Sequence, residues 1–253
     1  MDLVTSAQNP TIKLIRSLHE KKRRQETGLF LAEGAKVVAR SRQEGWSPDY
    51  LILRVGGPPA ECATARTILV SNRVMASLSR QANPPDIIGV FRQRIRDEMP
   101  LPAAGDVWVG LDTMRDPGNL GTIIRTADAI GAAGVVLIGQ SCDPWSPESV
   151  RATMGTIFAV PLIAVAVEGM ERTAASWPGE IVATKMNAPH DYRRSYARPV
   201  LLLMGSEGQG LLPRLASLAT ASVRIPMSGG AESLNVATAT ALMLYEIRRS
   251  ELA

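Results

Sequence analysis

Three stretches of the chain place polar side chains directly after an apolar run. The first, "DPGNLGTIIRTADAIGAAG" at 116–134, sets Asn119 and Arg125 beside a strongly apolar pattern. The second, "LLLMGSEGQGLLP" at 201–213, surrounds Glu207 with glycines, whose turns can offer backbone N–H groups to a ligand. The third, "RIPMSGGAESLNVATATALMLYEIRRS" at 224–250, carries Ser233 and Asn235. Together these groups could bind a polar substrate and stabilise charge that develops on it.

Each stretch taken alone also has a simpler interpretation. Asn119 is a good candidate for the N-cap of a helix, and Arg125 at the edge of that helix could simply face water. The buried face of this helix is predicted to hold Ile123, Ile124, Ala127 and Ile130. The glycine spacing in the second stretch is neither the dinucleotide-binding fingerprint nor a phosphate-binding P-loop. In the third stretch, Ser233 or Asn235 would serve as an ordinary helix cap.

The elements that must position these residues are strands buried on both faces. The second half of the chain has short, continuous apolar runs between helical stretches, which is typical of a parallel sheet covered by helices. The predicted strands are "VWVGL", "GVVLIG", "FAVPLIAV", "EIVATK", "VLLLMG" and "ASVRIPM". Ligands of open α/β sheets bind at the carboxyl edge of the strands. Because each polar stretch follows one of these strands, we expect all three at that edge.

The first part of the chain indicates a smaller α/β unit. In "NPTIKLIRSLHEKKRRQE", apolar residues recur at helical spacing and basic residues fill the other face. Strands and helices then alternate until about Asp97, and "DEMPLPAAGD" has the prolines and glycine of a linker. We therefore divide the chain into a domain at 1–97, a linker at 98–105 and a second domain at 106–253.

The composition excludes several classes of protein. A hydrophobic content of 45% with 21% charged residues, over 253 residues, is that of a globular protein. No apolar run approaches the roughly 20 residues that span a bilayer, and the N-terminus lacks the apolar core of a secretion signal. We expect a cytoplasmic protein that is not bound to a membrane. Two cysteines and two histidines argue against a disulfide framework, a metal site and a histidine-based triad.

The cations are unevenly distributed, although the formal net charge is only +4. Nine Lys and Arg residues between 13 and 42 face three acidic residues, and further basic runs are "FRQRIRDE" and "YRRSYAR". Clustered cations suit a polyanion such as RNA, because neutralising phosphates releases counterions. Any single run is equally well explained as a solvated surface. The predicted nucleic-acid contacts of the first of these runs are Lys13, Arg16, Lys21, Lys22, Arg23 and Arg24.

In this order, the three polar stretches closely resemble the signature motifs of the SpoU family. These proteins are RNA ribose 2'-O-methyltransferases of the knotted SPOUT superfamily. The resemblance covers Asp106 to about Arg249, and its asparagine, arginine, glutamate and Ser-Leu-Asn core are all present. The N-terminal region resembles, more loosely, the small α/β L30e-like domain with which many members bind their substrate.

The resemblance implies a fold, a cofactor and an oligomeric state. The fold would be a parallel-sheet SPOUT domain with a deep C-terminal trefoil knot, an exception to the rule that chains do not knot. The cofactor would be S-adenosyl-L-methionine, from which a methyl group passes to a ribose 2'-hydroxyl. The protein would be a homodimer joined through the methyltransferase domain. The implied cofactor contacts are Gly205, Ile225 and Leu234, with Met204, Gly210 and Pro226 beside them.

The resemblance also implies an active site of five polar residues. They are Asn119, Arg125, Glu207, Ser233 and Asn235. Arg125 would face the target nucleotide and take part in activating its 2'-hydroxyl. A guanidinium has a pKa above about 12, so Arg125 is better suited to binding a phosphate and stabilising an alkoxide than to accepting a proton.

The substrate is predicted less sharply than the reaction. Family members with an added N-terminal domain often act on ribosomal RNA, so we expect ribosomal RNA rather than transfer RNA. A non-catalytic RNA-binding or ribosome-assembly protein on the same fold is the alternative from another class. Loss of the arginine or of the Ser-Leu-Asn cluster would mark it, and both are retained. A Rossmann-type methyltransferase or NAD enzyme would need a glycine fingerprint that the chain lacks.

Overall fold

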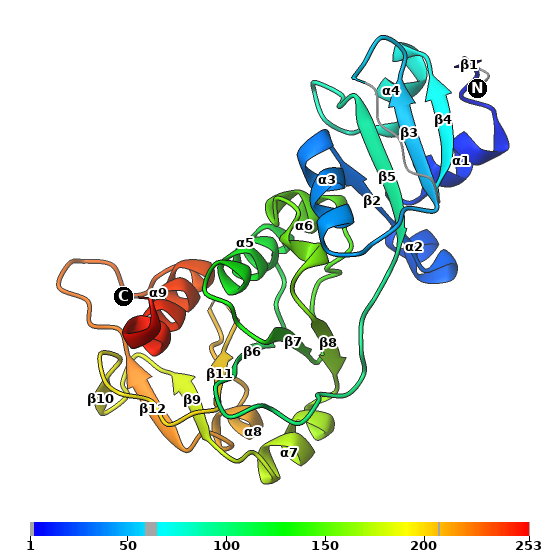
Figure 1. The fold of residues 1–253 in the computed structure, drawn as a ribbon. Coiled ribbons are helices and arrows are strands. Elements are labelled where there is room, and N and C mark those ends of the chain that lie inside the picture. Colours follow the sequence, from blue (N-terminus) through cyan, green and yellow to red (C-terminus); the bar gives the residue numbers. More distant parts are fainter. Residues whose placement is uncertain (1–2, 59–64, 207, 253) are drawn as a thin grey trace. The chain divides into compact units, whose positions relative to one another are not determined.

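The computed structural model describes residues 3–58, 65–206 and 208–252. These residues form two compact units, each made of two segments of the chain (Figure 1). Unit one comprises residues 1–94 and 143–159, and unit two comprises residues 95–142 and 160–253. The predicted boundary near 97 lies close to the first crossing between units, whereas the return of 143–159 to unit one has no counterpart in the predicted division.

Unit one is built on a mixed five-stranded sheet. In spatial order, its strands are β1 (Leu3–Val4), β4 (Arg66–Val70), β3 (Tyr50–Arg54), β5 (Ile87–Arg92) and β2 (Leu29–Glu33). β5 is antiparallel to both of its neighbours, and the other pairs are parallel. Alternation along β2 sends Leu29 and Leu31 into the core under α1 (Pro10–Ser17) and α4 (Asn72–Leu78), and Phe30 to the other face.

The basic helical pattern near the N-terminus forms two helices rather than one. α1 ends at Ser17, and α2 (Lys21–Thr27) follows after a short break. At the break, the Arg24 side chain donates through Nη1 to the carbonyl oxygen of Leu18 at 2.8 Å. The turn therefore satisfies a carbonyl that a continuous helix would have bonded internally. Gly28, with φ of 65°, ends α2 in the left-handed conformation that glycine adopts readily.

Residues 143–159 complete an aromatic core within unit one. This segment holds α6 (Pro147–Ala152) and the short 3₁₀ helix η1 (Thr156–Phe158), while α3 (Ala35–Gln43) packs on the same sheet. Trp145 stacks on Phe30 with ring centroids 4.6 Å apart, and Trp46 donates through Nε1 to the carbonyl of Phe158 at 2.9 Å. A cut at residue 97 would therefore remove the partners of Trp145 and Phe158.

Unit two confirms the predicted parallel sheet. Its strands, in spatial order, are β10 (His190–Asp191), β12 (Ala221–Arg224), β9 (Glu180–Thr184), β11 (Val200–Met204), β6 (Val107–Asp112), β7 (Gly134–Ile138) and β8 (Leu162–Val165). All neighbouring pairs are parallel. Six of these strands coincide with predicted apolar runs. β10 was not predicted, because its two residues carry no apolar signal.

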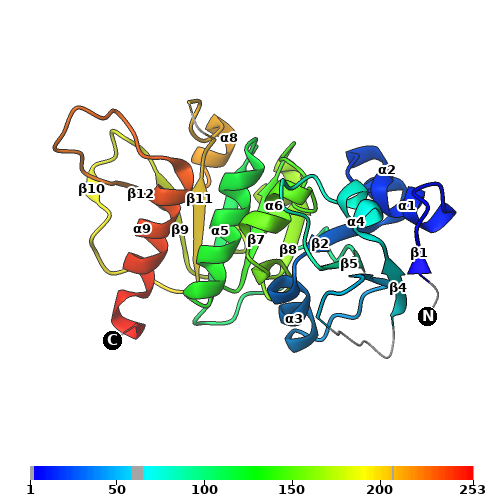
Figure 2. The same cartoon turned by 90° about the horizontal axis from the view of Figure 1, so that it is seen from above.

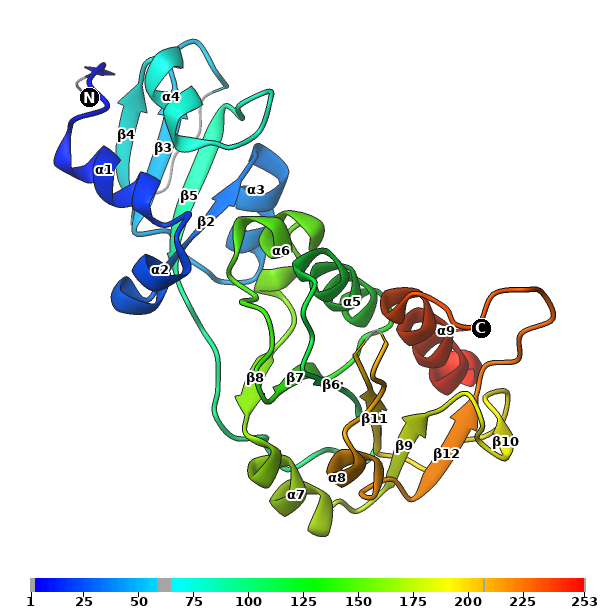
Figure 3. The same ribbon diagram turned by 180° about the vertical axis from the view of Figure 1, so that it is seen from behind.

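Helices cover both faces of this sheet. α5 (Pro117–Ala129) and α9 (Val236–Arg248) pack against each other on one face (Figures 1 and 2). α7 (Val167–Ala175) and α8 (Pro213–Ala216) lie together on the opposite face, and η2 (Arg249–Glu251) follows α9 (Figure 3). The trefoil knot implied by the family resemblance stays a prediction.

The start of α5 differs from the sequence-based expectation. The N-cap is Asp116, whose Oδ1 accepts the backbone N–H of Asn119 at 2.6 Å, and Pro117 occupies the first helical turn. The prediction that Asn119 caps this helix is therefore wrong, since Asp and Pro together form a better start. The buried face is as predicted: Ile123, Ile124, Ala127 and Ile130 are in the core, and Arg125 is exposed.

Candidate functional site

A pocket of about 850 Å³ lies at the carboxyl edge of the unit-two sheet. Its walls are the loops that follow three neighbouring strands, β9, β11 and β12, together with the first turn of α9. Parallel strands bring their carboxyl ends to one edge, so loops from distant parts of the sequence meet there. The lining includes Thr184–Asn187 after β9, Met204–Ser206, Gly208 and Gly210 after β11, Arg224–Met227 after β12, and Glu232–Val236 with Ala239.

Most of the predicted site residues of the second and third stretches line this pocket. All six predicted cofactor contacts do so, namely Met204, Gly205, Gly210, Ile225, Pro226 and Leu234. Ser233 and Asn235, predicted as active-site residues, line it as well. Glu207 lies outside the described residues. The roles of these side chains stay predictions, while their meeting around one pocket is a property of the fold.

The glycines of the second stretch allow a very tight loop. A side chain at Gly205 would overlap the backbone of Gly210 and Leu211. Ser206 and Gly210 exchange two backbone hydrogen bonds of 3.2 and 3.0 Å across the turn. Gly208 and Gly210 have φ of 87° and 68°, which disfavour residues with a Cβ. At Gly205, Gly208 and Gly210 the loop therefore presents backbone alone to the pocket.

A pair of asparagines joins the first and third stretches. Asn235 donates through Nδ2 to Oδ1 of Asn119 at 3.0 Å. The amide oxygen of the same side chain, Asn235 Oδ1, caps α9 by accepting a hydrogen bond from the backbone N–H of Ala237 at 2.9 Å. Of the two predicted caps, Ser233 and Asn235, the structure uses Asn235. This bond sets the α5 residue Asn119 next to the pocket wall.

Arg125 lies on the exposed face of α5, beyond Asn119 along the helix. It is absent from the lining of the pocket. Among residues 3–58, 65–206 and 208–252, no hydrogen bond or ion pair engages its guanidinium. The cation is therefore available to a ligand that approaches α5 from solvent.

One side of the pocket was missed by the sequence reasoning. The loop after β9, residues 184–187, contributes Lys185 and Asn187 to the lining. Its signal was present, because the predicted strand "EIVATK" ends on Lys185 and Asn187 follows two residues later at the same carboxyl edge. β9 lies between β11 and β12, so its loop has to fall between those that carry the other pocket residues.

The predicted RNA contacts of the N-terminal segment divide into three groups. Lys13, Arg16 and Lys21 are exposed and have no ion pair with any described residue. Lys22 and Arg23 share Glu26, at 4.0 and 2.5 Å respectively.

Arg24 is a correction to that prediction. Only 3% of the residue is exposed, and its Nε donates to Oδ2 of Asp143 at 2.8 Å. With Nη1 on the carbonyl of Leu18, the guanidinium holds the α1–α2 turn against residues 143–159. A cation buried in this way packs unit one and cannot touch RNA.

The basic run "YRRSYAR" is neutralised within unit two. Arg193 pairs with Asp191 at 2.8 Å, and hydrogen bonds from this arginine hold the pKa of Asp191 well below its usual range. Arg194 pairs with Glu180, and its guanidinium lies over the ring of Tyr196. Burial raises the pKa of Tyr196 to about 12. This run therefore contributes much less free positive charge than its sequence indicates.

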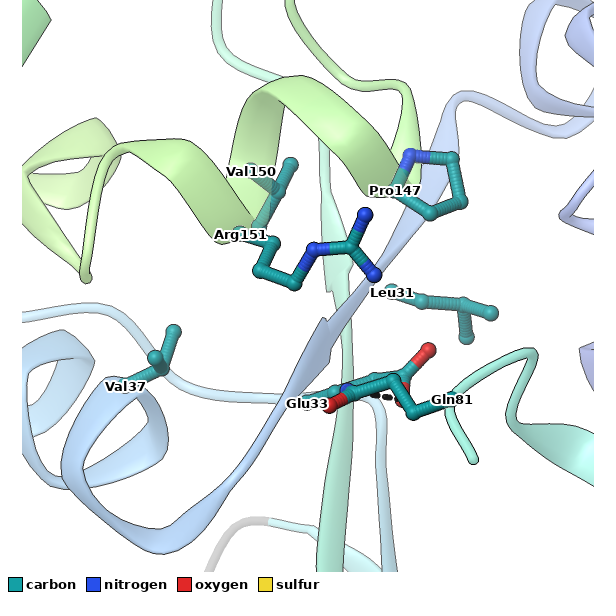
Figure 4. A pocket seen from close by; sticks show the side chains of 7 residues that line it. All are labelled: Leu31, Glu33, Val37, Gln81, Pro147, Val150 and Arg151. Atoms are coloured by element: carbon teal, nitrogen blue, oxygen red, sulfur yellow. Dashed lines mark hydrogen bonds between the residues drawn. The ribbon is translucent and has the colours of Figure 1, made fainter. Parts of the chain in front are cut away.

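A second cavity, in unit one, is far smaller. It measures about 10 Å³ and is lined by Leu31, Glu33, Val37, Gln81, Pro147, Val150 and Arg151 (Figure 4). Glu33 accepts hydrogen bonds from Ser79 Oγ at 2.6 Å and from Gln81 Nε2 at 2.8 Å. The space is about that of a single water molecule, so the cavity cannot hold a cofactor.

The described ranges hold neither a metal-binding cluster nor a membrane-spanning helix. No group of three or more His, Cys, Asp or Glu side chains in them is arranged to hold a metal ion. None of the described helices combines the length and apolar character needed to cross a bilayer.

Two different families of known proteins match the N-terminal and C-terminal parts of the chain. Residues 106–245, more than half of the chain, match the SpoU rRNA Methylase family. Residues 9–89 match the MRM3-like substrate binding domain.

Relatives and solved structures match over nearly the full length. A 23S rRNA (uridine(2479)-2'-O)-methyltransferase of Streptomyces viridochromogenes is 31% identical over 93% of this chain and 88% of its own. The 23S rRNA (guanosine(2553)-2'-O)-methyltransferase RlmP of Bacillus subtilis is 29% identical over 98% of this chain and its whole length. A crystal structure of an AdoMet-bound rRNA methyltransferase from Sinorhizobium meliloti superposes with a TM-score of 0.90 at 42% identity, covering 100% and 99% of the two chains.

Proposed function

Because the chain belongs to the SpoU rRNA methylase family, we propose that it transfers a methyl group from S-adenosyl-L-methionine to a ribose 2'-hydroxyl of ribosomal RNA. The observation that carries this proposal is the pocket of about 850 Å³ lined by all six predicted cofactor contacts. The named relatives act on 23S rRNA, which favours ribosomal over transfer RNA. They modify a uridine and a guanosine, so the proposal specifies the RNA class and leaves the nucleotide open.

The pocket suits an elongated ligand with both apolar and polar parts. Met204, Ile225 and Leu234 supply apolar surface, and the glycine loop offers backbone groups at close range. Lys185 and Glu232 add charges of opposite sign to the wall, as a ligand with an amino group and a carboxylate requires. S-adenosyl-L-methionine, when bound there, supplies a methyl group activated by the sulfonium charge.

The chain's own residues would position the ribose and manage its charge. The Asn119–Asn235 pair lies where α5 meets the pocket wall and can orient the ribose through amide hydrogen bonds. Ser233 adds a hydroxyl from the same wall. Arg125, exposed and without a protein partner among the described residues, would bind an adjacent phosphate and stabilise the alkoxide. It would stay protonated, so the 2'-hydroxyl proton has to leave to another acceptor.

Two further features support a homodimer joined through unit two. α9 exposes Leu242 and Tyr245, 37% and 52% accessible, about one turn apart on its outer face. α9 packs beside α5, so a second copy docked there would lie close to Arg125. Molar mass from light scattering tests this point, since a monomer at micromolar concentration would contradict it.

The RNA would be gripped by unit one as well as by the active site. Lys13, Arg16 and Lys21 present positive charge with no carboxylate paired to it among the described residues. Phosphate contacts of this kind position an RNA without reading its sequence. A cytoplasmic location follows from such a substrate and belongs to the same proposal.

The test is transfer of labelled methyl from S-adenosyl-L-methionine to unmodified ribosomal and transfer RNA pools. Label in alkali-resistant dinucleotides of ribosomal RNA is expected, because a methylated 2'-oxygen cannot attack the neighbouring phosphate. Arg125→Ala should lose at least about 100-fold in rate, as removal of one charge-stabilising donor does. Its cofactor affinity should change little, because Arg125 is outside the pocket lining. Arg172→Ala, an exposed arginine on α7, is the matched control.

The other outcomes are equally informative. Label confined to transfer RNA would replace the proposed substrate class. Cofactor binding without label in either pool would favour a non-catalytic RNA-binding or ribosome-assembly protein. A rate for Arg125→Ala equal to that of Arg172→Ala would remove Arg125 from the active site.

A further inference from the structure

We propose that Asp112 is a positioning residue that holds the end of the glycine loop at Leu212, and thereby keeps Gly205, Gly208 and Gly210 in one wall of the cofactor pocket. Asp112 ends β6 and is 1% exposed. It is not among the residues that line the pocket, and it would act only through the loop that it binds. The inference rests on the proposed function, in that the pocket is taken to bind S-adenosyl-L-methionine.

Both carboxylate oxygens of Asp112 are engaged. Oδ2 accepts the backbone N–H of Leu212 at 2.7 Å, and Oδ1 accepts the hydroxyl of Thr113 at 2.8 Å. A buried carboxylate is costly unless hydrogen bonds compensate it, and bonds to an ionised acceptor are stronger than neutral ones. The only bond from this carboxylate to a distant part of the chain, within the described ranges, is the one to Leu212.

The bond closes the far end of the glycine loop. At its start, the loop leaves β11 next to β6, where Met204 pairs with Leu111. At its end, Leu212 precedes α8, whose first residue, Pro213, has no N–H to donate. Between these points, Gly208 and Gly210 have positive φ, and glycines give the loop many alternative conformations once an end is released. Asp112 therefore restrains a segment whose own glycine-rich sequence does not favour one backbone conformation.

The turn after β6 brings the hydroxyl of Thr113 to the carboxylate of Asp112. Thr113 has φ of 48°, a conformation that is costly for a β-branched residue. In this conformation its hydroxyl donates to Asp112, and its backbone N–H donates to the carbonyl of Ile138 at 3.1 Å. The same turn leads into Asp116 and α5, so β6 links the pocket loop to the helix that carries Asn119 and Arg125.

The experiment measures binding of S-adenosylhomocysteine to the full chain by calorimetry. Asp112→Ala is expected to raise Kd about 10- to 100-fold, which corresponds to the loss of one hydrogen bond to a charged acceptor. Asp112→Asn keeps an acceptor for Leu212, and the Thr113 hydroxyl can accept from the new amide, so Kd should stay within about threefold. Asp106→Ala is the matched control: Asp106 accepts the N–H of Ala103 at 2.9 Å, at the opposite end of β6.

A second variant removes the same bond from the donor side. Leu212 has φ of −54°, close to that of proline, and its side chain is largely exposed. Leu212→Pro therefore deletes the N–H with little other change, and it should raise Kd as Asp112→Ala does. The double variant should bind no more weakly than either single one, because both delete one interaction.

The kinetic signature separates positioning from bulk stability. In Asp112→Ala, KM for the cofactor should rise with Kd, while kcat at saturating cofactor stays within about threefold, since no group near the reacting atoms has changed. A Kd within about twofold of wild type in both Asp112→Ala and Leu212→Pro, whatever their melting temperatures, would overturn the inference. A wild-type chain that fails to bind S-adenosylhomocysteine would instead count against the proposed function.

Discussion

Two segments rich in basic residues have different surroundings in the folded chain. In the segment at 13–24, Lys13, Arg16 and Lys21 stay exposed and without an ion pair to any described residue. In the segment at 191–198, Arg193 and Arg198 pair with Asp191 and Glu251. Arg194 pairs with Glu180. The charge that matters to a polyanion is what remains after such pairing, and two of these carboxylates come from distant parts of the chain.

Arg24 is the buried cation of the first segment, where Lys22 and Arg23 pair with Glu26 at the surface, and it gives the largest expected effect. Arg24→Ala would leave Asp143 buried and unpaired, so the free energy of unfolding of unit one should fall by about 3–5 kcal/mol. Urea denaturation of the full chain, followed by tryptophan fluorescence, measures this change, because Trp145 lies two residues from Asp143.

The neighbouring arginine provides the control. Arg23→Ala breaks an exposed pair with Glu26 and should cost less than about 1 kcal/mol. Equal losses of unfolding free energy in the two variants would mean that the buried Arg24–Asp143 ion pair does not stabilise unit one. The structural difference between buried and exposed cations would then have no effect on stability.

The second prediction concerns the unpaired cations. Replacing Lys13, Arg16 and Lys21 together by alanine should weaken binding of ribosomal RNA fragments by at least about tenfold. The slope of log K against log salt should fall by about 0.7–0.9 for each phosphate that the variant no longer neutralises. Filter binding between low and moderate salt gives both numbers. The matched variant is Arg193→Ala, which removes a cation already neutralised by Asp191 and should change affinity less than about twofold.

A reversed order of these two effects would show that RNA lies along residues 191–198 rather than along α1 and α2. An unchanged salt slope in the triple variant, with affinity reduced, would indicate that these cations act on folding and not on phosphate.

The smallest effect is expected at Glu251. Hydrogen bonds from Arg248 and Arg198 lower the pKa of this carboxyl below its ordinary value. A lowered folded-state pKa means that the stabilisation is present above the unfolded pKa, near 4.3, and is lost as pH falls through the folded value. Glu251→Gln should therefore lower Tm by less than about 3 °C at pH 7, and the difference should shrink as the pH falls through the lowered folded-state pKa. A difference that grows on acidification would contradict the ion pairs at the end of α9.

Much of unit two could be predicted, because its signals are local. Continuous apolar runs identified six of the seven strands, and the order of the polar stretches identified the family, which the comparisons confirm. The glycines at 205, 208 and 210 indicate a tight turn from the sequence alone, since a Cβ at 205 would overlap Gly210 and the positive φ at 208 and 210 disfavours other residues. The sequence predicted either Ser233 or Asn235 as the N-cap of α9, and Asn235 forms it.

The misses concern partners that are distant in sequence. Nothing near Arg24 indicates that Asp143 lies 119 positions away, within hydrogen-bond distance. The same applies to Asp112 and Leu212, which are 100 positions apart. Asn119 was assigned the cap that Asp116 makes, because both residue types suit that position and the pattern could not choose between them.

The sequence by itself determined most strands of unit two, the family and the residue types at each loop, because hydrophobic period, glycine and capping chemistry act over a few residues. The tertiary structure decided which of these groups share a pocket, which cations keep their charge exposed and which carboxylate holds which loop. Such choices depend on the strand order β12-β9-β11-β6, which brings four separate loops to one edge. Only folding sets that order, since pairing between strands far apart in the chain leaves no local pattern to read.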